Sequence, residues 1–170
     1  MGLSVTRTLD NQVLQTWNLH NDILLSLIGK IPERGAEVAP IDSPGSSVAE
    51  QFAHLDRVRR AWLQYHATGK EPQVAQTRLP KTAPVNPRSL PILRQQLKES
   101  GDQVSQLLSD SLRGDAEIQM FGQSPVQWLG YLIAHESHHR GQIMLALKQS
   151  RLQLPEGVAE DELWGPWIDR

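Results

Sequence analysis

The sequence predicts an all-α protein, a four-helix bundle whose helices run up-down-down-up. Four stretches of about 20 residues repeat apolar residues at helical spacing, and none shows the alternation of a strand. Connections rich in proline and glycine separate these stretches. The chain has 170 residues, 39% of them hydrophobic and 21% charged. This is enough for one domain with its own core, so we expect a single domain over residues 1–170.

The first two predicted helices have recognisable boundaries. The first spans about residues 8–28 and ends at Gly29. The second spans about residues 47–66 and opens with a capping box. In such a box the Ser47 hydroxyl and the Glu50 carboxylate each satisfy a backbone N–H group at the start of the helix.

The last two predicted helices open at prolines. The third begins at Asn86-Pro87, an N-cap followed by proline at the first helical position. The fourth spans about residues 125–150, with Ser124 as its N-cap, proline first and glutamine third. The tail segment 164–167 reads Trp-Gly-Pro-Trp, which we expect to be too short for a helix of its own.

The connection between the second and third helices predicts their relative direction. It spans about residues 68–86, whereas an antiparallel pair of helices needs only a few connecting residues. Fully extended, about 19 residues reach about 60 Å, twice the length of a helix of about 20 residues. The chain can therefore return along the bundle in a long crossover and start the third helix parallel to the second.

Composition excludes several classes of protein. There is no cysteine, which removes disulfide frameworks, thiolate nucleophiles and cysteine-based metal sites. Seventeen basic against nineteen acidic residues give a net charge of −2, so we expect no nucleic-acid partner. We also expect no membrane segment, because no apolar run approaches the length that spans a bilayer. Residues 1–10 lack a signal pattern, and the expected location is the cytoplasm.

Three of the six histidines lie within five residues of the fourth helix: His135, His138 and His139. At about 100° per residue, His135 and His139 lie about 40° apart on the face that carries Trp128 and Leu132. This places the pair in the middle of the apolar stripe, with His138 nearer its edge. Two imidazoles are costly to bury there without partners. The pattern predicts a metal site completed by a histidine on a facing helix; the alternative is hydrogen-bonded histidines without a metal.

Three neutral imidazoles would leave the charge of a divalent ion uncompensated and one coordination position open, which is typical of a catalytic site. Such an ion activates water or holds a substrate anion. The run from His135 to His139 also matches the H-E-x-x-H pattern of zinc peptidases, with Glu136 as the general base. The longer peptidase signature fails, because Gly141 comes one position too early. Glu136 is therefore a general base, a residue that supports the metal ligands, or a solvated residue. We favour the solvated position.

Three smaller features give weaker expectations. Gly141 lies within the fourth helix, where glycine costs about 1 kcal/mol against alanine, so we expect another helix to approach closely there. Arg140 points away from the histidine face and is expected at an inter-helix or dimer contact. Asn18 and Asn21 face either the cavity or the surface.

Three segments resemble the DinB-like superfamily of four-helix bundles. The clearest is AHESHHRGQ at residues 134–142, which resembles the motif on the family's fourth helix. Residues 47–55, SVAEQFAHL, resemble its second helix, which carries a metal-ligand histidine. Residues 17–21, WNLHN, resemble its first helix.

This resemblance implies a metal site formed by His54, His135 and His139. It selects His54 over His20 and His66, between which spacing alone does not decide. The expected cofactor is a divalent ion, zinc or nickel, and the expected assembly is a homodimer. Characterised relatives are metal-dependent S-transferases or isomerases that use thiols such as bacillithiol or mycothiol. The expected partners are therefore a small-molecule thiol and an electrophile. The alternatives are a metal-dependent hydrolase and a non-catalytic metal-binding dimer module.

Overall fold

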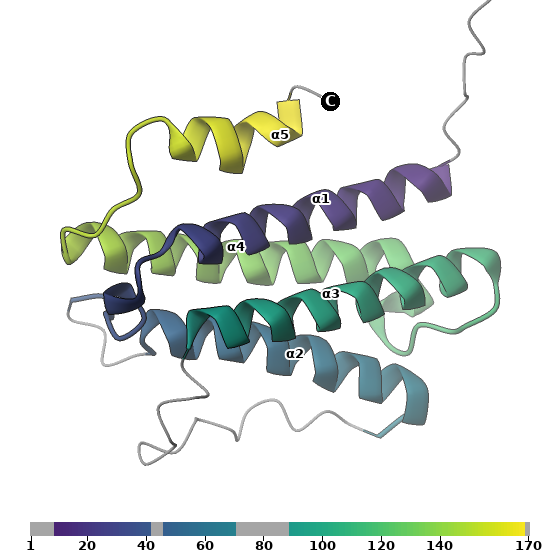
Figure 1. The fold of residues 1–170 in the computed structure, drawn as a ribbon. Helices are drawn as coiled ribbons and strands as arrows, with labels where there is room; N and C mark the ends of the chain where they lie inside the picture. The colour runs from purple at the N-terminus through teal and green to yellow at the C-terminus, as the bar shows by residue number, and fades with distance from the viewer. Residues whose placement is uncertain (1–8, 42–45, 71–88, 169–170) are drawn as a thin grey trace, which may run out of the picture.

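The structure is a computed structural model that describes residues 9–41, 46–70 and 89–168. Within these ranges every regular element is helical and no strand occurs, so the predicted all-α class is confirmed there. The long helices are α1 (Leu9–Lys30), α2 (Val48–Thr68), α3 (Leu90–Arg113) and α4 (Pro125–Gln149) (Figure 1). The short ones are η1 (Glu33–Gly35), η4 (Phe121–Gln123), η5 (Ala159–Trp164) and α5 (Gly165–Ile168). In the described ranges, no helix combines the length and hydrophobicity needed to cross a bilayer.

The predicted caps form at the starts of α2 and α4. The Ser47 hydroxyl accepts from the Glu50 N–H at 3.3 Å, and the Glu50 carboxylate accepts from the Ser47 N–H at 2.8 Å. The predicted capping box of α2 is therefore present. At α4, the Ser124 hydroxyl accepts from the Gln127 N–H at 3.3 Å. These bonds satisfy donors that a helix start leaves without internal partners.

Two predicted boundaries differ from the structure. α1 continues through Gly29 and ends at Lys30, because the packing of its last buried turn outweighs the cost of one glycine. α3 begins at Leu90, with Ser89 as its N-cap and proline in its first turn. The predicted start at Asn86-Pro87 lies outside the described residues.

The tail is helical from Ala159 to Ile168, which corrects the expectation of no helix there. Tertiary contacts explain this. Leu163 is buried in the core, and the Glu162 carboxylate accepts from the Ser26 hydroxyl at 2.6 Å and pairs with Lys30 at 2.8 Å. Packing against α1 thus overrides the low intrinsic stability of a short helix. The Arg140 guanidinium lies 5.4 Å from the centre of the Trp164 ring, so its contact joins α4 to this tail.

α2 and α3 run in the same direction. Near their middles, Arg59 donates to the carbonyl of Leu97 at 2.8 Å. Towards their C-terminal ends, His66 and Gln106 line one cavity. α1 and α4 run the opposite way (Figure 1). The predicted crossover covers residues 71–88, which lie outside the described ranges.

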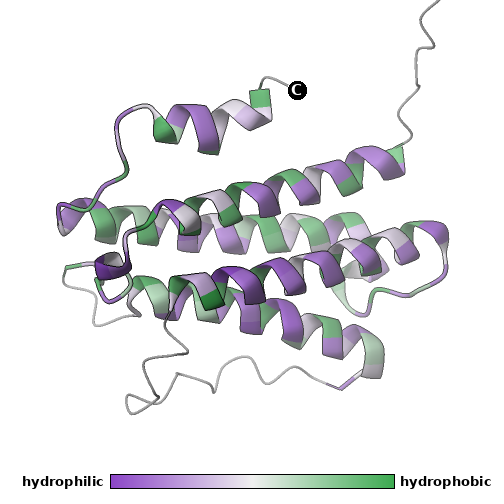
Figure 2. Cartoon of the chain, in the orientation of Figure 1, coloured by the Kyte–Doolittle hydropathy of each residue, from purple (hydrophilic) through white to green (hydrophobic). Residues whose placement is uncertain are grey.

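The core consists of two apolar clusters stacked along the bundle. One is centred on Leu27, Phe52 and Leu97, and the other on Trp17 and Trp128. All four long helices contribute buried residues to the first cluster, whereas α2 reaches the second only through the partly buried Trp62 and Leu63. Apolar and polar positions alternate along each helix, as expected of an amphipathic helix (Figure 2). A layer of buried polar residues separates the two clusters, and each of the four long helices contributes to it. Its members are His20, Asn21, Arg59, Ser100 and Glu136.

Candidate metal centre

The three predicted ligands lie together where α2 faces α4. His54 projects from α2, and His135 and His139 project from successive turns of α4. One ring nitrogen from each lies within 4.8 Å of the other two. The Nε2 atoms of His54 and His135 are 3.3 Å apart. Among the described residues that could ligate an ion, this is the one group of three or more, and it contains histidines alone.

The spacing of these nitrogens fits a divalent ion. Two nitrogens bound tetrahedrally to zinc at about 2.0–2.1 Å are about 3.3–3.4 Å apart. The His54–His135 pair already has this separation. The widest pair in the group, within 4.8 Å, is more open than in a bound site. The residues present therefore have the donor type and the approximate spacing of a three-histidine site.

Gln51 orients His139, and sequence patterns did not predict this role. It lies one turn before His54 on α2 and is buried. The Nδ1–H of His139 donates to its Oε1 at 3.3 Å, which leaves the Nε2 lone pair of His139 free. Metal-binding histidines commonly donate their second nitrogen in this way. The available signal was that Gln51 precedes His54 by three residues and so shares its side of the helix.

All three imidazoles are neutral at pH 7. Burial, then the neighbouring His135 and Arg57, lower the pKa of His54 to about 4. Burial, followed by the other histidines of the cluster, lowers the pKa of His139 to about 4. Burial also lowers the pKa of His135. A neutral imidazole keeps a lone pair, so the group can bind a cation at neutral pH.

The other three histidines lie elsewhere. His138 is exposed and its Nε2 accepts from Gln142 at 3.0 Å. His66 is buried near the far end of α2, where its Nδ1 accepts from the Gln119 N–H at 3.1 Å. His20 is buried in the polar layer of the core. Of the three histidines that spacing left open as partners, His54 faces the α4 pair.

The buried face of α4 is rotated by part of a turn from the predicted one, so the expected central position of the histidine pair on it is wrong. The residues buried on α4 include Leu129, Ile143 and Leu147, which sequence analysis did not count. With them, the buried face covers angles from about 20° to about 120° from His135. His135 therefore lies at its edge and is half-buried, whereas Glu136, expected to be solvated, is 1% exposed.

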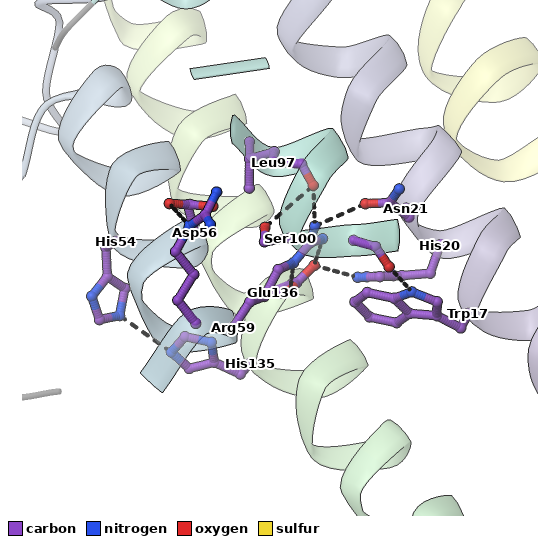
Figure 3. Close-up of polar contacts among 12 residues, drawn as sticks. Trp17, His20, Asn21, His54, Asp56, Arg59, Leu97, Ser100, His135 and Glu136 are labelled. Carbon is purple, nitrogen blue, oxygen red and sulfur yellow. Dashed lines mark hydrogen bonds and ion pairs between the residues drawn. The ribbon is translucent and has the colours of Figure 1, made fainter. Parts of the chain in front are cut away.

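Glu136 is held by two partners on two other helices (Figure 3). Arg59 donates to both carboxylate oxygens, through Nε and Nη2, at 2.7 Å each. The His20 Nε2–H donates to Oε2 at 2.8 Å. Burial alone would raise the pKa of Glu136, but the charge and hydrogen bonds of Arg59 and the bond from His20 lower it to about 2. The carboxylate is therefore ionised, and both its oxygens already accept hydrogen bonds, so it is not placed as a general base.

Arg59 ties this carboxylate to the remaining helices. Its Nη1 donates to the Oδ1 of Asn21 on α1 and to the carbonyl of Leu97 on α3, both at 2.8 Å. Its guanidinium lies 4.9 Å from the centre of the Trp17 ring. Asn21 is thus a buried partner of Arg59, while Asn18 accepts from Ser105 at 2.9 Å.

The glycine at which two helices approach closely is Gly101 on α3, and not Gly141 on α4 as predicted. A Cβ on Gly141 would meet no atom within 4 Å, so the expected helix contact there is wrong. A Cβ on Gly101 of α3 would lie 2.5–2.7 Å from the Asn21 side chain. The Gly101 carbonyl also accepts from the Trp17 indole at 2.9 Å. Gly101 therefore makes room for the polar layer.

Aromatic rings lie beside the histidine group. Tyr131, one turn before His135, stacks on it with ring centres 5.8 Å apart and planes 14° apart. Trp62 and Phe121 contact Tyr131 at ring separations of 5.7 and 5.2 Å. Phe121 belongs to a turn in which residues 120–123 all have positive φ. Tyr131 is 36% exposed, so part of its ring reaches solvent beside the histidine group.

Comparison with known proteins places the chain in a family. The model of the DinB family matches residues 1–152, which include all four long helices and the three histidines. The tail elements η5 and α5 follow the matched region. No curated protein matches the chain. A match over most of the sequence, together with the helical structure, establishes that the chain belongs to the DinB family.

Proposed function

We propose that this protein binds one divalent ion, zinc or nickel, through His54, His135 and His139, and uses a low-molecular-weight thiol in a transferase or isomerase reaction. The observation that carries the proposal is the convergence of three ring nitrogens, one from each neutral histidine of the group on α2 and α4. A divalent ion held there would supply a thiolate at neutral pH, by lowering the pKa of a thiol that reaches it.

The chain's own residues support thiol chemistry in three ways. The protein has no cysteine, so the thiol comes from a small molecule. The half-buried position of the histidines limits water while leaving access from one side. The ring of Tyr131, stacked on His135, offers a surface that orients an apolar electrophile.

Glu136 disfavours the alternative of a peptidase-like hydrolase. That mechanism needs the glutamate of H-E-x-x-H free to take a proton from water. Here the carboxylate is buried, and both its oxygens accept hydrogen bonds from Arg59 and His20. A non-catalytic metal-binding module is the second alternative, and it predicts metal binding without turnover.

Cobalt-substituted protein tests the proposal. Candidate thiols are added and the near-ultraviolet spectrum is examined for a sulfur-to-cobalt charge-transfer band, followed by an assay of conjugation to a generic electrophile. We expect the band and turnover in the wild type and in His138→Ala, and neither in His139→Ala. Absence of the band with every thiol, together with hydrolysis of an ester or amide, would favour the hydrolase. Metal binding with neither activity would favour the binding module.

We infer a four-helix bundle of up-down-down-up order with a crossover between α2 and α3, supported by the parallel contacts of these helices. We further propose a cytoplasmic homodimer without a nucleic-acid partner. Light scattering combined with size-exclusion chromatography tests the dimer, because a mass near 38 kDa is twice that of the 19.1 kDa chain.

A further inference from the structure

Arg59 and Glu136 connect the two helices that carry the candidate ligands. Glu136 directly follows His135 on α4, and Arg59 lies five residues after His54 on α2. At most 1% of either side chain is exposed, and two parallel bonds of 2.7 Å join them. The ion pair therefore fixes α4 against α2 within about 8 Å along the helices from the ligands.

Stability alone does not account for this pair. The desolvation penalty of a buried ion pair commonly matches or exceeds its attraction, and apolar side chains of similar volume often serve a fold as well. Apolar clusters lie on both sides of the pair, so such side chains would have neighbours to pack against. A bidentate arginine–carboxylate contact adds something apolar packing lacks, because it accepts a narrow range of distances and orientations.

The histidine group depends on such a fixed register. The Nε2 atoms of His54 and His135 come from different helices and lie 3.3 Å apart. A slide of α4 by a single residue would move one by about 1.5 Å, enough to spoil a ligand geometry. The same carboxylate is also tied to α1 through His20, and its arginine to α3 through the Leu97 carbonyl. All four long helices are thus placed relative to one ion pair (Figure 3).

We propose that the Arg59–Glu136 pair is a positioning element of the metal centre, which sets the register of α2 against α4 at which the three histidines converge. This inference rests on the proposed function, because that function gives the histidines their ion. The pair itself contacts neither ion nor substrate. Its removal should lower metal affinity more than an equal loss of fold stability elsewhere does.

The test replaces both partners at once, as Arg59→Met/Glu136→Leu. This variant leaves no buried charge unpaired, and the net charge beside the histidines is unchanged. We expect unchanged helicity by circular dichroism but a lower Tm, because His20, Asn21 and the Leu97 carbonyl lose their hydrogen-bond partners. Zinc affinity, measured by competition with a chromogenic chelator, should fall about tenfold or more. Val104→Ala is the matched control: it removes buried volume from the Trp17 cluster, so it should lower Tm and leave zinc affinity unchanged.

If the double variant does not fold, Arg59→Lys tests the positioning role instead. Lysine keeps the positive charge but lacks the fork that contacts both oxygens. We expect this variant to fold and to bind zinc several-fold more weakly than the wild type. Wild-type affinity in the folded double variant or in Arg59→Lys would overturn the positioning role while leaving the proposed metal site intact. Failure of the wild type itself to bind zinc would overturn both.

Discussion

Two adjacent residues of α4, His135 and Glu136, lie in opposite environments. His135 is half-buried and neutral, and its Nε2 faces another imidazole nitrogen. Glu136 is buried and ionised, and both its oxygens accept hydrogen bonds. A helix turns about 100° per residue, so one step separates the edge of the core from its interior. The histidine group keeps its lone pairs available for a ligand, whereas the glutamate oxygens accept hydrogen bonds that hold the helices together.

Removing a ligand should give the largest effect. His139→Ala removes one of three nitrogens, so we expect stoichiometric zinc to be lost while helicity stays near the wild-type value. His139 is half-buried, and no charge is left unpaired by its removal. Metal analysis after dialysis and circular dichroism measure the two quantities. His138→Ala is the matched control and should keep its zinc, because His138 is exposed and lies outside the group. Full zinc content in His139→Ala would refute the assignment.

Truncating the buried carboxylate should instead lower stability. Glu136→Ala leaves the Arg59 guanidinium buried without its main partner, and we expect the free energy of unfolding to fall by about 3–5 kcal/mol. Asp56→Ala, which removes the partner of the more exposed Arg60, should cost about 1 kcal/mol or less. Urea denaturation of chelator-treated protein measures both. Equal losses in the two variants would contradict the structural role of the buried pair.

A pH effect tests the buried imidazole at the far end of α2, which lies outside the candidate metal centre. Burial lowers the pKa of His66 to about 4, against about 6.5 in an unfolded chain. Between these values the unfolded chain binds a proton that the folded protein does not, so stability falls as pH falls from about 6.5 to about 4. His66 alone is expected to lower the free energy of unfolding by about 2–3 kcal/mol over this pH range.

The variant His66→Phe isolates this contribution. It loses the bond from the Gln119 N–H at every pH, but its stability should decline less steeply than that of the wild type between pH 6.5 and 4. Urea denaturation at intervals of half a pH unit gives the two slopes. Parallel slopes would show that His66 does not titrate differently in the folded and unfolded states.

Two glycines should respond with opposite signs, and these are the smallest effects. Gly101→Ala brings a methyl group onto the Asn21 side chain, so we expect a loss of about 1–3 kcal/mol. Gly141→Ala meets no neighbour and improves helix propensity, so we expect a gain of up to about 1 kcal/mol. Thermal denaturation of both variants gives the comparison. A loss in Gly141→Ala would show that this position is covered, as it would be at a dimer contact.

Sequence patterns predicted the parts of this protein that local chemistry determines. Apolar periodicity identified four helices, and the Ser47 capping box located the start of α2 within one residue. Spacing on one helix paired His135 with His139. It could not choose His54 as the facing partner, because that depends on how α2 and α4 pack, and the family resemblance supplied it.

The environment of Glu136 was beyond sequence patterns for a related reason. A glutamate beside an apolar stripe is usually solvated, and its arginine partner lies 77 residues away on another helix. The same limit applies to Gly101, whose neighbour Asn21 belongs to α1. In each case the deciding contact joins two helices, whereas periodicity describes one helix at a time.

The most direct test of the metal centre is the X-ray absorption spectrum at the zinc edge of the zinc-loaded protein. We expect one ion per chain with three imidazole nitrogens at about 2.0–2.1 Å and one further light ligand. His54→Ala should lose one imidazole from this shell or lose the ion. A shell of six oxygens, or an unchanged set of three imidazoles in His54→Ala, would contradict a centre formed by His54, His135 and His139.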